Sequence, residues 1–240
     1  MNRFLAMAIA ALSIFSVGCY YISNEINDTN TVYDKMFQNN DEIKYLALGD
    51  SYTIGESVEE NLRWPVQLVD RLRDDSVLTA DAKIIARTGW TTDELMKGIE
   101  AANPESDYNL VSLLIGVNNQ YRGRDIDNFR SELAELIELA VRKAGNEKSN
   151  IIVLSIPDWG AMPFAAGRDR QQIAAEIDAY NKVVMEECGF AGVEFFDITD
   201  ISRKAPLDES LVAADGLHPS GKMYGLWVNR IYTHVYELLK

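Results

Sequence analysis

The sequence predicts an α/β protein in which five parallel strands form one sheet that is covered by helices on both faces. The first observation is a set of short apolar segments that mostly lack polar–apolar alternation, as is typical of strands buried on both faces. The second is that helical patterns separate these segments, and strands alternating with helices form right-handed βαβ units with a parallel sheet. The composition agrees, because 240 residues with 47% hydrophobic and 25% charged residues suit one large globular domain. The five predicted strands are 44–48, 83–86, 110–115, 151–156 and 193–196.

A helix is predicted after each strand. Apolar residues recur at helical spacing from Ile126 to Val141, and two further apolar stripes predict helices near 173–184 and 227–238. Pro65 suits the first turn of a helix that follows the first strand. The segment from Thr91 to Glu94 has the capping-box pattern that opens a helix after the second strand.

The first 18 residues have the pattern of a signal peptide. Residues 1–3 supply a positive start, and residues 4–17 form an apolar segment that is too short for an ordinary membrane-spanning helix. The segment ends at Gly18 and Cys19, which resembles a bacterial lipoprotein signal, although Ser16 stands where that signal more often has leucine. The resemblance implies lipidation of Cys19 and a membrane anchor for an exported protein on the periplasmic or outer surface of the cell envelope. Simple secretion after cleavage near Gly18 and an uncleaved anchor are the alternatives.

Three regions therefore divide the chain. A signal peptide is expected over 1–18, and the following segment, 19–42, is rich in Asn, Asp, Glu, Ser and Thr without periodicity, which is typical of a polar tether. The predicted α/β domain spans 43–240.

The charge balance argues against nucleic acid as a partner. The chain has 37 acidic and 23 basic residues, giving a net charge of −14, whereas a nucleic-acid-binding surface must be cationic. The densest basic cluster consists of Arg168 and Arg170 around Asp169, which is too small to form such a surface.

Metal binding is not expected either. A zinc site needs about four closely spaced nitrogen or sulfur ligands. Cys188 follows an apolar helical segment and is expected to be an inert thiol rather than a nucleophile. The two cysteines and two histidines do not offer zinc-site spacing; they are Cys19, Cys188, His218 and His234.

The loops that follow the strands are where a functional site is expected, because sites in parallel α/β sheets lie at the carboxyl ends of the strands. Ser51, in Gly49-Asp50-Ser51 after the first strand, is either a nucleophile at a strand-to-helix turn or an ordinary helix N-cap. A Gly-x-Ser-x-Gly motif is absent from the sequence, so the common α/β-hydrolase arrangement is not indicated.

A serine nucleophile needs a base, and His218 is the better placed of the two histidines. It lies in a loop three residues after Asp215, which is close enough to accept a hydrogen bond from one ring nitrogen and leave the other for Ser51. The alternative is an ordinary Asp-Gly turn with a solvated histidine. His234 falls within the C-terminal apolar stripe and is expected to be a helix-face residue.

Two further loops offer hydrogen-bond donors for an oxyanion. Gly89 follows the second strand and presents a backbone N–H with no side chain to block approach. Asn118 follows the third strand and carries an amide donor of the type that stabilises tetrahedral intermediates. Each residue alone is an ordinary turn residue, but the four loops together bring the required residue types to one sheet edge.

These blocks, taken in order, resemble those of the SGNH (GDSL-type) hydrolase family. They are Leu46-Ala-Leu-Gly-Asp-Ser-Tyr-Thr53, Gly89, Gly116-Val-Asn-Asn119 and Asp215-Gly-Leu-His218. The resemblance extends from about residue 44 to the end of the chain. It implies a flavodoxin-like three-layer α/β/α sandwich and ester hydrolysis without a metal or cofactor.

The resemblance also implies a role for each matching residue. Ser51 is expected to be the nucleophile, His218 the general base and Asp215 the residue that orients the histidine. The N–H groups of Ser51 and Gly89 and the side chain of Asn118 are expected to form the oxyanion hole. Asn119 departs from the aspartate found in many members, and we expect it to tune the geometry of the neighbouring donor.

The substrate is less well defined by the sequence. The resemblance allows lysophospholipids, short acyl esters, acetylated carbohydrates and thioesters. An acyltransferase that uses the same acyl-enzyme, and a catalytically silent binding module of the cell envelope, are the alternatives to an esterase. The segment 156–160 is expected to be a substrate loop. Aromatic residues expected in loops around the substrate are Tyr52, Trp90, Tyr121, Trp159 and Phe164, although any of them could instead anchor its loop on the core.

Overall fold

The computed structural model describes residues 42–240. The predicted signal peptide (1–18), the predicted lipidation site at Cys19 and all but the last residue of the predicted tether (19–42) lie outside the described residues. Within 42–240, no helix has both the length and the apolar character needed to cross a membrane.

Five parallel strands form a single sheet in the order β2-β1-β3-β4-β5. This is the flavodoxin-like order, and it confirms the predicted fold class. Every predicted strand is present, and its ends differ from the prediction by no more than about two residues. The strands are β1 (Tyr45–Gly49), β2 (Lys83–Ala86), β3 (Leu110–Leu114), β4 (Ile151–Leu154) and β5 (Glu194–Phe196).

Burial differs between the central and the edge strands. β1, β3 and β4 are buried along their whole length, as the apolar pattern predicted. The prediction of burial on both faces is wrong for β2 and β5, where Lys83 and Glu194 are exposed. These strands end the sheet, so each has only one neighbouring strand and a less complete cover.

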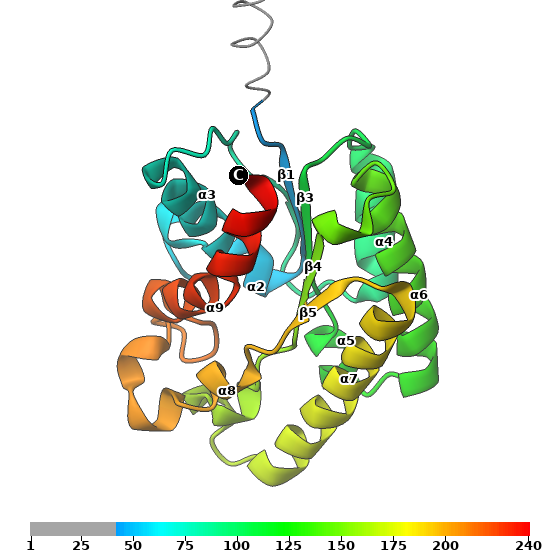
Figure 1. Cartoon of the computed structure of the whole chain (residues 1–240). Helices are drawn as coiled ribbons and strands as arrows, with labels where there is room; N and C mark the ends of the chain where they lie inside the picture. The colour runs from blue at the N-terminus through cyan, green and yellow to red at the C-terminus, as the bar shows by residue number, and fades with distance from the viewer. Residues whose placement is uncertain (1–41) are drawn as a thin grey trace, which may run out of the picture. The chain divides into compact units, whose positions relative to one another are not determined.

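Five long helices cover the sheet and confirm the five helices predicted. In Figure 1, α3 and α9 lie on one side of the sheet and pack against each other, while α6 packs against α4 and α7 on the other side. They are α3 (Trp64–Asp74), α4 (Thr92–Ala102), α6 (Ile126–Lys143), α7 (Arg170–Ala191) and α9 (Gly221–Leu239).

Shorter helical segments lie in the loops at the carboxyl ends of the strands and elsewhere on the described chain. Three are α-helical: α2 (Ser51–Ile54), α5 (Val117–Tyr121) and α8 (Thr199–Ser202). The 3-10 helices are Glu60–Leu62, Lys148–Asn150, Trp159–Ala161, Pro163–Ala165, Ala205–Leu207 and Glu209–Leu211.

Local sequence explains where the long helices begin. The predicted capping box is present at α4, where the backbone N–H of Thr91 donates to the carboxylate of Glu94 at 2.9 Å. α7 begins after Asp169, whose side chain accepts hydrogen bonds from the backbone N–H groups of Gln171 and Gln172. These caps satisfy N–H groups that have no partner within the helix.

Aromatic packing joins α2 to the core. Trp64 of α3 and Trp227 of α9 are both completely buried. The ring of Tyr52, in α2, lies edge-on to Trp227 with 6.3 Å between centroids. This contact holds α2, and with it Ser51, against the layer formed by α3 and α9.

Candidate active site

Ser51 is the first residue of α2 and lies at the carboxyl end of β1. Asp50 caps this short helix by accepting a hydrogen bond from the backbone N–H of Tyr52 at 3.0 Å. Only glycine fits at position 49, because a Cβ there would lie 2.2 Å from Oγ1 of Thr53. The tight turn gives Ser51, whose exposed fraction is 5%, a well-defined place at the edge of the sheet.

His218 and Asp215 form a hydrogen-bonded pair in the loop before α9. Nδ1 of His218 lies 2.6 Å from Oδ2 of Asp215. The other carboxylate oxygen, Oδ1, accepts hydrogen bonds from the backbone N–H groups of Leu217 and His218, each at 2.9 Å. The contact expected from the three-residue spacing is therefore present, and it orients the imidazole ring.

The environment of Asp215 favours its ionised form. Partial burial acts to raise its pKa, but hydrogen bonds from His218, Ser57 and the backbone N–H groups outweigh this and hold the pKa well below its usual range. An ionised carboxylate at this position can stabilise a positive charge on His218.

Ser57 is a member of the site that was not expected from the sequence. Its hydroxyl donates to Oδ2 of Asp215 at 2.7 Å. Ser57 has a φ of +64°, in the left-handed region that residues with a Cβ rarely adopt. No local sequence pattern signals this contact, because the two residues are brought together only by the tertiary fold.

Gly89 and Asn118 lie at the carboxyl ends of β2 and β3. Gly89 has a φ of +85°, which favours glycine, and its carbonyl oxygen accepts a hydrogen bond from Nη2 of Arg122 at 2.6 Å. Asn118 donates through Nδ2 to the carbonyl oxygen of Trp90 at 2.9 Å, which leaves its second amide hydrogen for another acceptor. A backbone N–H and an amide N–H are the donor types that an oxyanion hole uses.

Four of the predicted catalytic and oxyanion residues line one pocket of about 210 Å³, the central pocket; they are Ser51, Gly89, Asn118 and His218. Asp215 does not line it and lies behind His218. Within the described part of the chain, no hydrogen bond joins the hydroxyl of Ser51 to His218, although both residues line this pocket. Catalytic hydrogen bonds are often long before a substrate is bound. The residues that line it are Ser51, Tyr52, Thr88, Gly89, Val117, Asn118, Tyr121, Trp159, Phe164, Leu217 and His218.

Three aromatic side chains form one wall of the central pocket. Trp159 is almost fully buried, and its Nε1–H donates to Oε1 of Gln120 at 2.8 Å. Tyr121 and Phe164 are more exposed and lie edge-on to Trp159, with 5.3 and 6.2 Å between ring centroids. The structure thus brings Tyr121 and Trp159 to the pocket, together with Phe164.

Tyr52 and Trp90 were predicted to be loop residues near the substrate, and the structure gives them different surroundings. Tyr52 lines the central pocket, but it belongs to α2 and is 2% exposed. Trp90 is not among the residues that line the pocket. Its ring lies against Gly98 of α4, where a Cβ would come within 2.2 Å of the ring. The substrate role predicted for Trp90 is therefore not supported, because its ring packs against a neighbouring helix.

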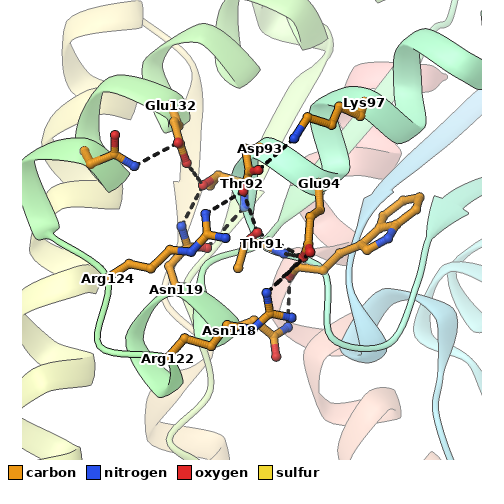
Figure 2. A network of polar contacts seen from close by, with 12 residues as sticks. Thr91, Thr92, Asp93, Glu94, Lys97, Asn118, Asn119, Arg122, Arg124 and Glu132 are labelled. Atoms are coloured by element: carbon orange, nitrogen blue, oxygen red, sulfur yellow. Dashed lines mark hydrogen bonds and ion pairs between the residues drawn. The ribbon is translucent and has the colours of Figure 1, made fainter.

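Asn119, expected to tune the oxyanion donor, is a buried link between two segments (Figure 2). Its Oδ1 accepts a hydrogen bond from the backbone N–H of Thr92 at 3.1 Å, and its Nδ2 donates to Oγ1 of Thr92 at 2.7 Å. The Thr92 hydroxyl donates in turn to the carboxylate of Glu132. Asn119 therefore attaches α5, which carries Asn118, to the start of α4.

Two ion pairs extend the same network (Figure 2). Arg122 contacts the carboxylate of Glu94 at 3.3 Å, and Arg124 contacts Asp93 at 2.5 Å. Since Arg122 also binds the carbonyl oxygen of Gly89, the network connects two of the three predicted oxyanion donors, Gly89 and Asn118, to α4. Arg122 is a further residue that the sequence analysis did not identify.

Asp50 is the buried carboxylate beside Ser51. Its exposed fraction is zero, and Oδ2 has no hydrogen-bond partner among the described residues. Burial raises its pKa to about 7, and the hydrogen bond from the backbone of Tyr52 only partly opposes this effect.

The thiol of Cys188 and the imidazole of His234 do not line the central pocket. Cys188 is buried in α7, and burial raises the pKa of its thiol to about 12, in agreement with the expected inert role. His234 lies within α9, as predicted, with its ring edge-on to Phe196. Residues 42–240 contain no cluster of three or more side chains that could hold a metal ion.

A pocket at the carboxyl edge of a parallel sheet, lined by a serine and by a histidine that is bound to a carboxylate, is an arrangement that hydrolases of ester bonds use. The chain belongs to the GDSL-like lipase/acylhydrolase family, whose model matches residues 47–226. No curated protein sequence gives a significant match.

Solved structures support the same fold. TesA superposes with a TM-score of 0.64 at 19% identity, over 82% of this chain and 99% of that chain. The lipase/acylhydrolase from Enterococcus faecalis has a TM-score of 0.61 at 22% identity, over 82% and 97%. Axe2, an acetylxylan esterase from Geobacillus stearothermophilus, has a TM-score of 0.60 at 19% identity, over 80% and 94%.

Proposed function

We propose that this hydrolase is a serine esterase that cleaves carboxylic esters with short acyl groups through an acyl-enzyme on Ser51. The observation that carries the proposal is that Ser51 and His218 line one pocket, while Nδ1 of His218 is bound by an ionised Asp215. A nucleophile, a base and an orienting carboxylate are the three parts of this chemistry.

The reaction proceeds in two halves. Oγ of Ser51 attacks the ester carbonyl carbon while His218 takes the hydroxyl proton. The oxyanion is stabilised by the N–H groups of Ser51 and Gly89 and by the amide of Asn118. The imidazolium then protonates the leaving alcohol. Water, deprotonated by His218, attacks the acyl carbon of the acyl-enzyme. The bond to Oγ then breaks, and the imidazolium returns its proton to Oγ, which releases the carboxylic acid and free Ser51.

The size of the central pocket supports a short acyl group. Its volume of about 210 Å³ lies below the range of roughly 300 to 1,000 Å³ that is typical for drug-sized ligands. Acetyl and butyryl groups fit such a space more readily than a long fatty acyl chain. Acetylxylan esterases among the structures with this fold are consistent with a small acyl group.

The first test measures hydrolysis of p-nitrophenyl acetate, butyrate and octanoate by the full chain. We expect acetate and butyrate to be cleaved faster than octanoate. Ser51→Ala and His218→Gln should each lower kcat by at least about a thousandfold. Matched controls are Ser131→Ala, on the exposed face of α6, and His234→Gln, which should retain activity.

Labelling with a fluorophosphonate gives an independent readout. Covalent modification of Ser51 that is lost in Ser51→Ala supports the proposal. Full activity in Ser51→Ala would remove Ser51 as the nucleophile. Release of a new ester rather than free acid when alcohols are added would indicate an acyltransferase instead. A folded chain with no labelling and no hydrolysis would indicate a silent binding module.

We also propose that the protein is exported and anchored through lipid on Cys19. The support is the sequence of residues 1–19, with its apolar segment and following cysteine. In a bacterial host fed with labelled palmitate, the full chain should become labelled and fractionate with membranes. Cys19→Ser should lose both properties, and persistent labelling of that variant would contradict the proposal.

A further inference from the structure

A second depression, the outer groove, adjoins the central pocket. The two share Tyr121 and Trp159 as lining residues, so the aromatic wall of the pocket also borders the groove. The outer groove has a volume of about 440 Å³, and its polar lining comes mainly from Gln120, Arg168, Gln172 and Glu176. A substrate too large for the central pocket would extend past Tyr121 and Trp159 into the outer groove.

Arg168 presents unused hydrogen-bond donors at the groove. Its guanidinium carbon lies 5.4 Å from the ring centroid of Tyr121 and 5.3 Å from that of Trp159. Nη2 makes one side-chain hydrogen bond, to the hydroxyl of Tyr121 at 3.2 Å. Within residues 42–240 no carboxylate forms an ion pair with Arg168, whose side chain bonds to the Tyr121 hydroxyl, although a guanidinium carries five N–H donors. These cation–π contacts hold the guanidinium in place while most of its N–H donors stay available.

Two amides and a carboxylate, those of Gln120, Gln172 and Glu176, also line the groove. Glu176 accepts hydrogen bonds from Nε2 of Gln120 at 2.6 Å and from Nε2 of Gln172 at 2.8 Å. Oε1 of Gln172 accepts no hydrogen bond within the described chain, and each amide nitrogen has a second hydrogen. The lining therefore offers both donors and acceptors, held in place by their contacts with one another.

This chemistry discriminates between possible alcohol groups. A hydrocarbon chain would leave the amides and the guanidinium without partners, which is unfavourable. A phosphate would meet the carboxylates of Asp169 and Glu176, which also line the groove. A sugar has hydroxyls that both donate and accept, and its C–H faces pack on aromatic rings such as that of Tyr121, which is 47% exposed.

We propose that the outer groove binds the sugar residues of an O-acylated oligosaccharide whose ester lies in the central pocket. This inference rests on the proposed serine esterase function, since it assigns the alcohol part of that enzyme's substrate. The acyl group occupies the central pocket, and neighbouring sugar hydroxyls bond to Arg168 and Gln172. Tyr121 contacts both parts of the substrate.

The experiment compares two substrates of the full chain. O-acetylated xylo-oligosaccharides place sugar hydroxyls in the outer groove, whereas the alcohol part of p-nitrophenyl acetate has no hydroxyl for Arg168 or Gln172 to bind. Arg168→Gln and Gln172→Ala should each raise KM for the oligosaccharide about tenfold, the effect of losing one hydrogen bond to a charged or well-placed group. Gln172→Ala should leave kcat/KM for p-nitrophenyl acetate unchanged.

Gln171→Ala is the matched control, because Gln171 is the exposed neighbour of Gln172 on α7 and does not line the groove. It should change neither substrate's kinetics. Gln172→Ala leaves the three aromatic rings and their contact with Arg168 untouched, so its result stands even where Arg168→Gln disturbs the aromatic wall.

The outcomes separate this inference from the proposed function. Unchanged oligosaccharide kinetics in both variants, or equal losses on both substrates, would overturn the outer groove as a sugar site. Wild-type cleavage of p-nitrophenyl acetate without cleavage of the acetylated oligosaccharide would also overturn it and leave the esterase intact. A higher kcat/KM for a lysophospholipid than for the acetylated oligosaccharide, with the lysophospholipid activity lowered by Arg168→Gln, would likewise overturn the sugar site and leave the esterase intact. Hydrolysis of p-nitrophenyl acetate that survives in Ser51→Ala would instead contradict the proposed function itself.

Discussion

The hydroxyl of Ser57 donates a hydrogen bond to Oδ2 of Asp215, the same oxygen that lies 2.6 Å from Nδ1 of His218. Ser57 makes this contact from a left-handed backbone conformation with a φ of +64°. This conformation costs about 1 kcal/mol for a residue with a Cβ. Glycine would relieve that cost but lose the hydroxyl. The geometry therefore indicates that Ser57 is a positioning residue for the Asp215–His218 pair.

Ser57→Gly should separate positioning from backbone strain. Loss of the hydroxyl leaves Asp215 less firmly held, so we expect kcat on p-nitrophenyl acetate to fall about five- to tenfold with KM unchanged, equivalent to one hydrogen bond. Thermal stability should stay equal or rise slightly, because glycine suits a positive φ. Steady-state kinetics and a thermal melt measure both effects.

The chain offers a matched control in Ser76, a serine with a φ of +65° that lies outside the site. Ser76→Gly should change stability as Ser57→Gly does and leave kcat unchanged. Equal kcat in the two variants would show that Ser57 has no positioning role.

Much of the fold could be predicted because the relevant signals are local. Buried apolar segments predict the three central strands, and the capping pattern from Thr91 to Glu94 predicts the start of α4. The Asp215–His218 contact is also local, since the two residues are three positions apart. Burial of the edge strands was overpredicted, because an apolar segment does not reveal whether neighbours cover it on both sides.

The parts that sequence could not predict depend on contacts between distant segments. Ser57 reaches Asp215 across the fold, and Arg122 reaches the carbonyl of Gly89 from a different loop. Trp90 resembles a loop aromatic in the sequence, but the absence of a side chain at Gly98 makes room for its ring on α4. None of these contacts has a spacing or composition signal.

Asn118→Ala tests the oxyanion hole. The variant removes one donor from the central pocket, and loss of such a donor lowers kcat on the order of a hundred- to a thousandfold. Folding should be retained, because the lost bond to the carbonyl of Trp90 contributes only about 1 kcal/mol. The measurement is kcat on p-nitrophenyl acetate together with a urea unfolding curve.

Asn128→Ala provides the comparison. Asn128 is an exposed asparagine of α6 whose Nδ2 donates to Glu132 at 2.8 Å, so its loss also removes one side-chain hydrogen bond. Its kcat should match that of the wild type. An unchanged rate in Asn118→Ala would remove Asn118 from the site.

Asp50 predicts a pH dependence of stability. Burial raises its pKa to about 7 in the folded state, above the value near 4 of an exposed aspartate. Between these two values the folded state binds a proton that the unfolded state has lost, so this contribution to the free energy of unfolding falls as the pH rises from about 4 to about 7. Above pH 7 the loss is complete.

Asp50→Asn should remove that dependence, because an amide does not titrate. Between pH 5 and pH 8 the Asp50 contribution to the unfolding free energy of the wild type should fall by on the order of 2 kcal/mol. The variant has no such loss, so its stability relative to the wild type should rise by this amount. Urea unfolding at both pH values measures the gain. Asp74→Asn, at an exposed position of α3, removes the same charge and should show no comparable gain. Parallel pH profiles for Asp50→Asn and the wild type would refute the prediction.

The network in Figure 2 predicts that Asn119 and Glu132 are energetically coupled through Thr92. The Thr92 hydroxyl accepts from Asn119 and donates its single hydrogen to Glu132. In Asn119→Asp, two carboxylates compete for that hydrogen, and one buried acceptor loses its partner. We expect a loss of about 2 kcal/mol in the free energy of unfolding.

Glu132→Gln should restore most of this loss in the double variant, because the new amide can donate to the Thr92 oxygen while the hydroxyl donates to the aspartate at position 119. The direction of the hydrogen-bond chain is then reversed, with every member satisfied. Glu132→Gln alone should cost less than Asn119→Asp, since the glutamine oxygen still accepts from Thr92. A double-mutant cycle by urea unfolding measures the coupling, expected at about 1 kcal/mol or more. Strictly additive losses would mean that the Thr92 hydroxyl does not link the two side chains.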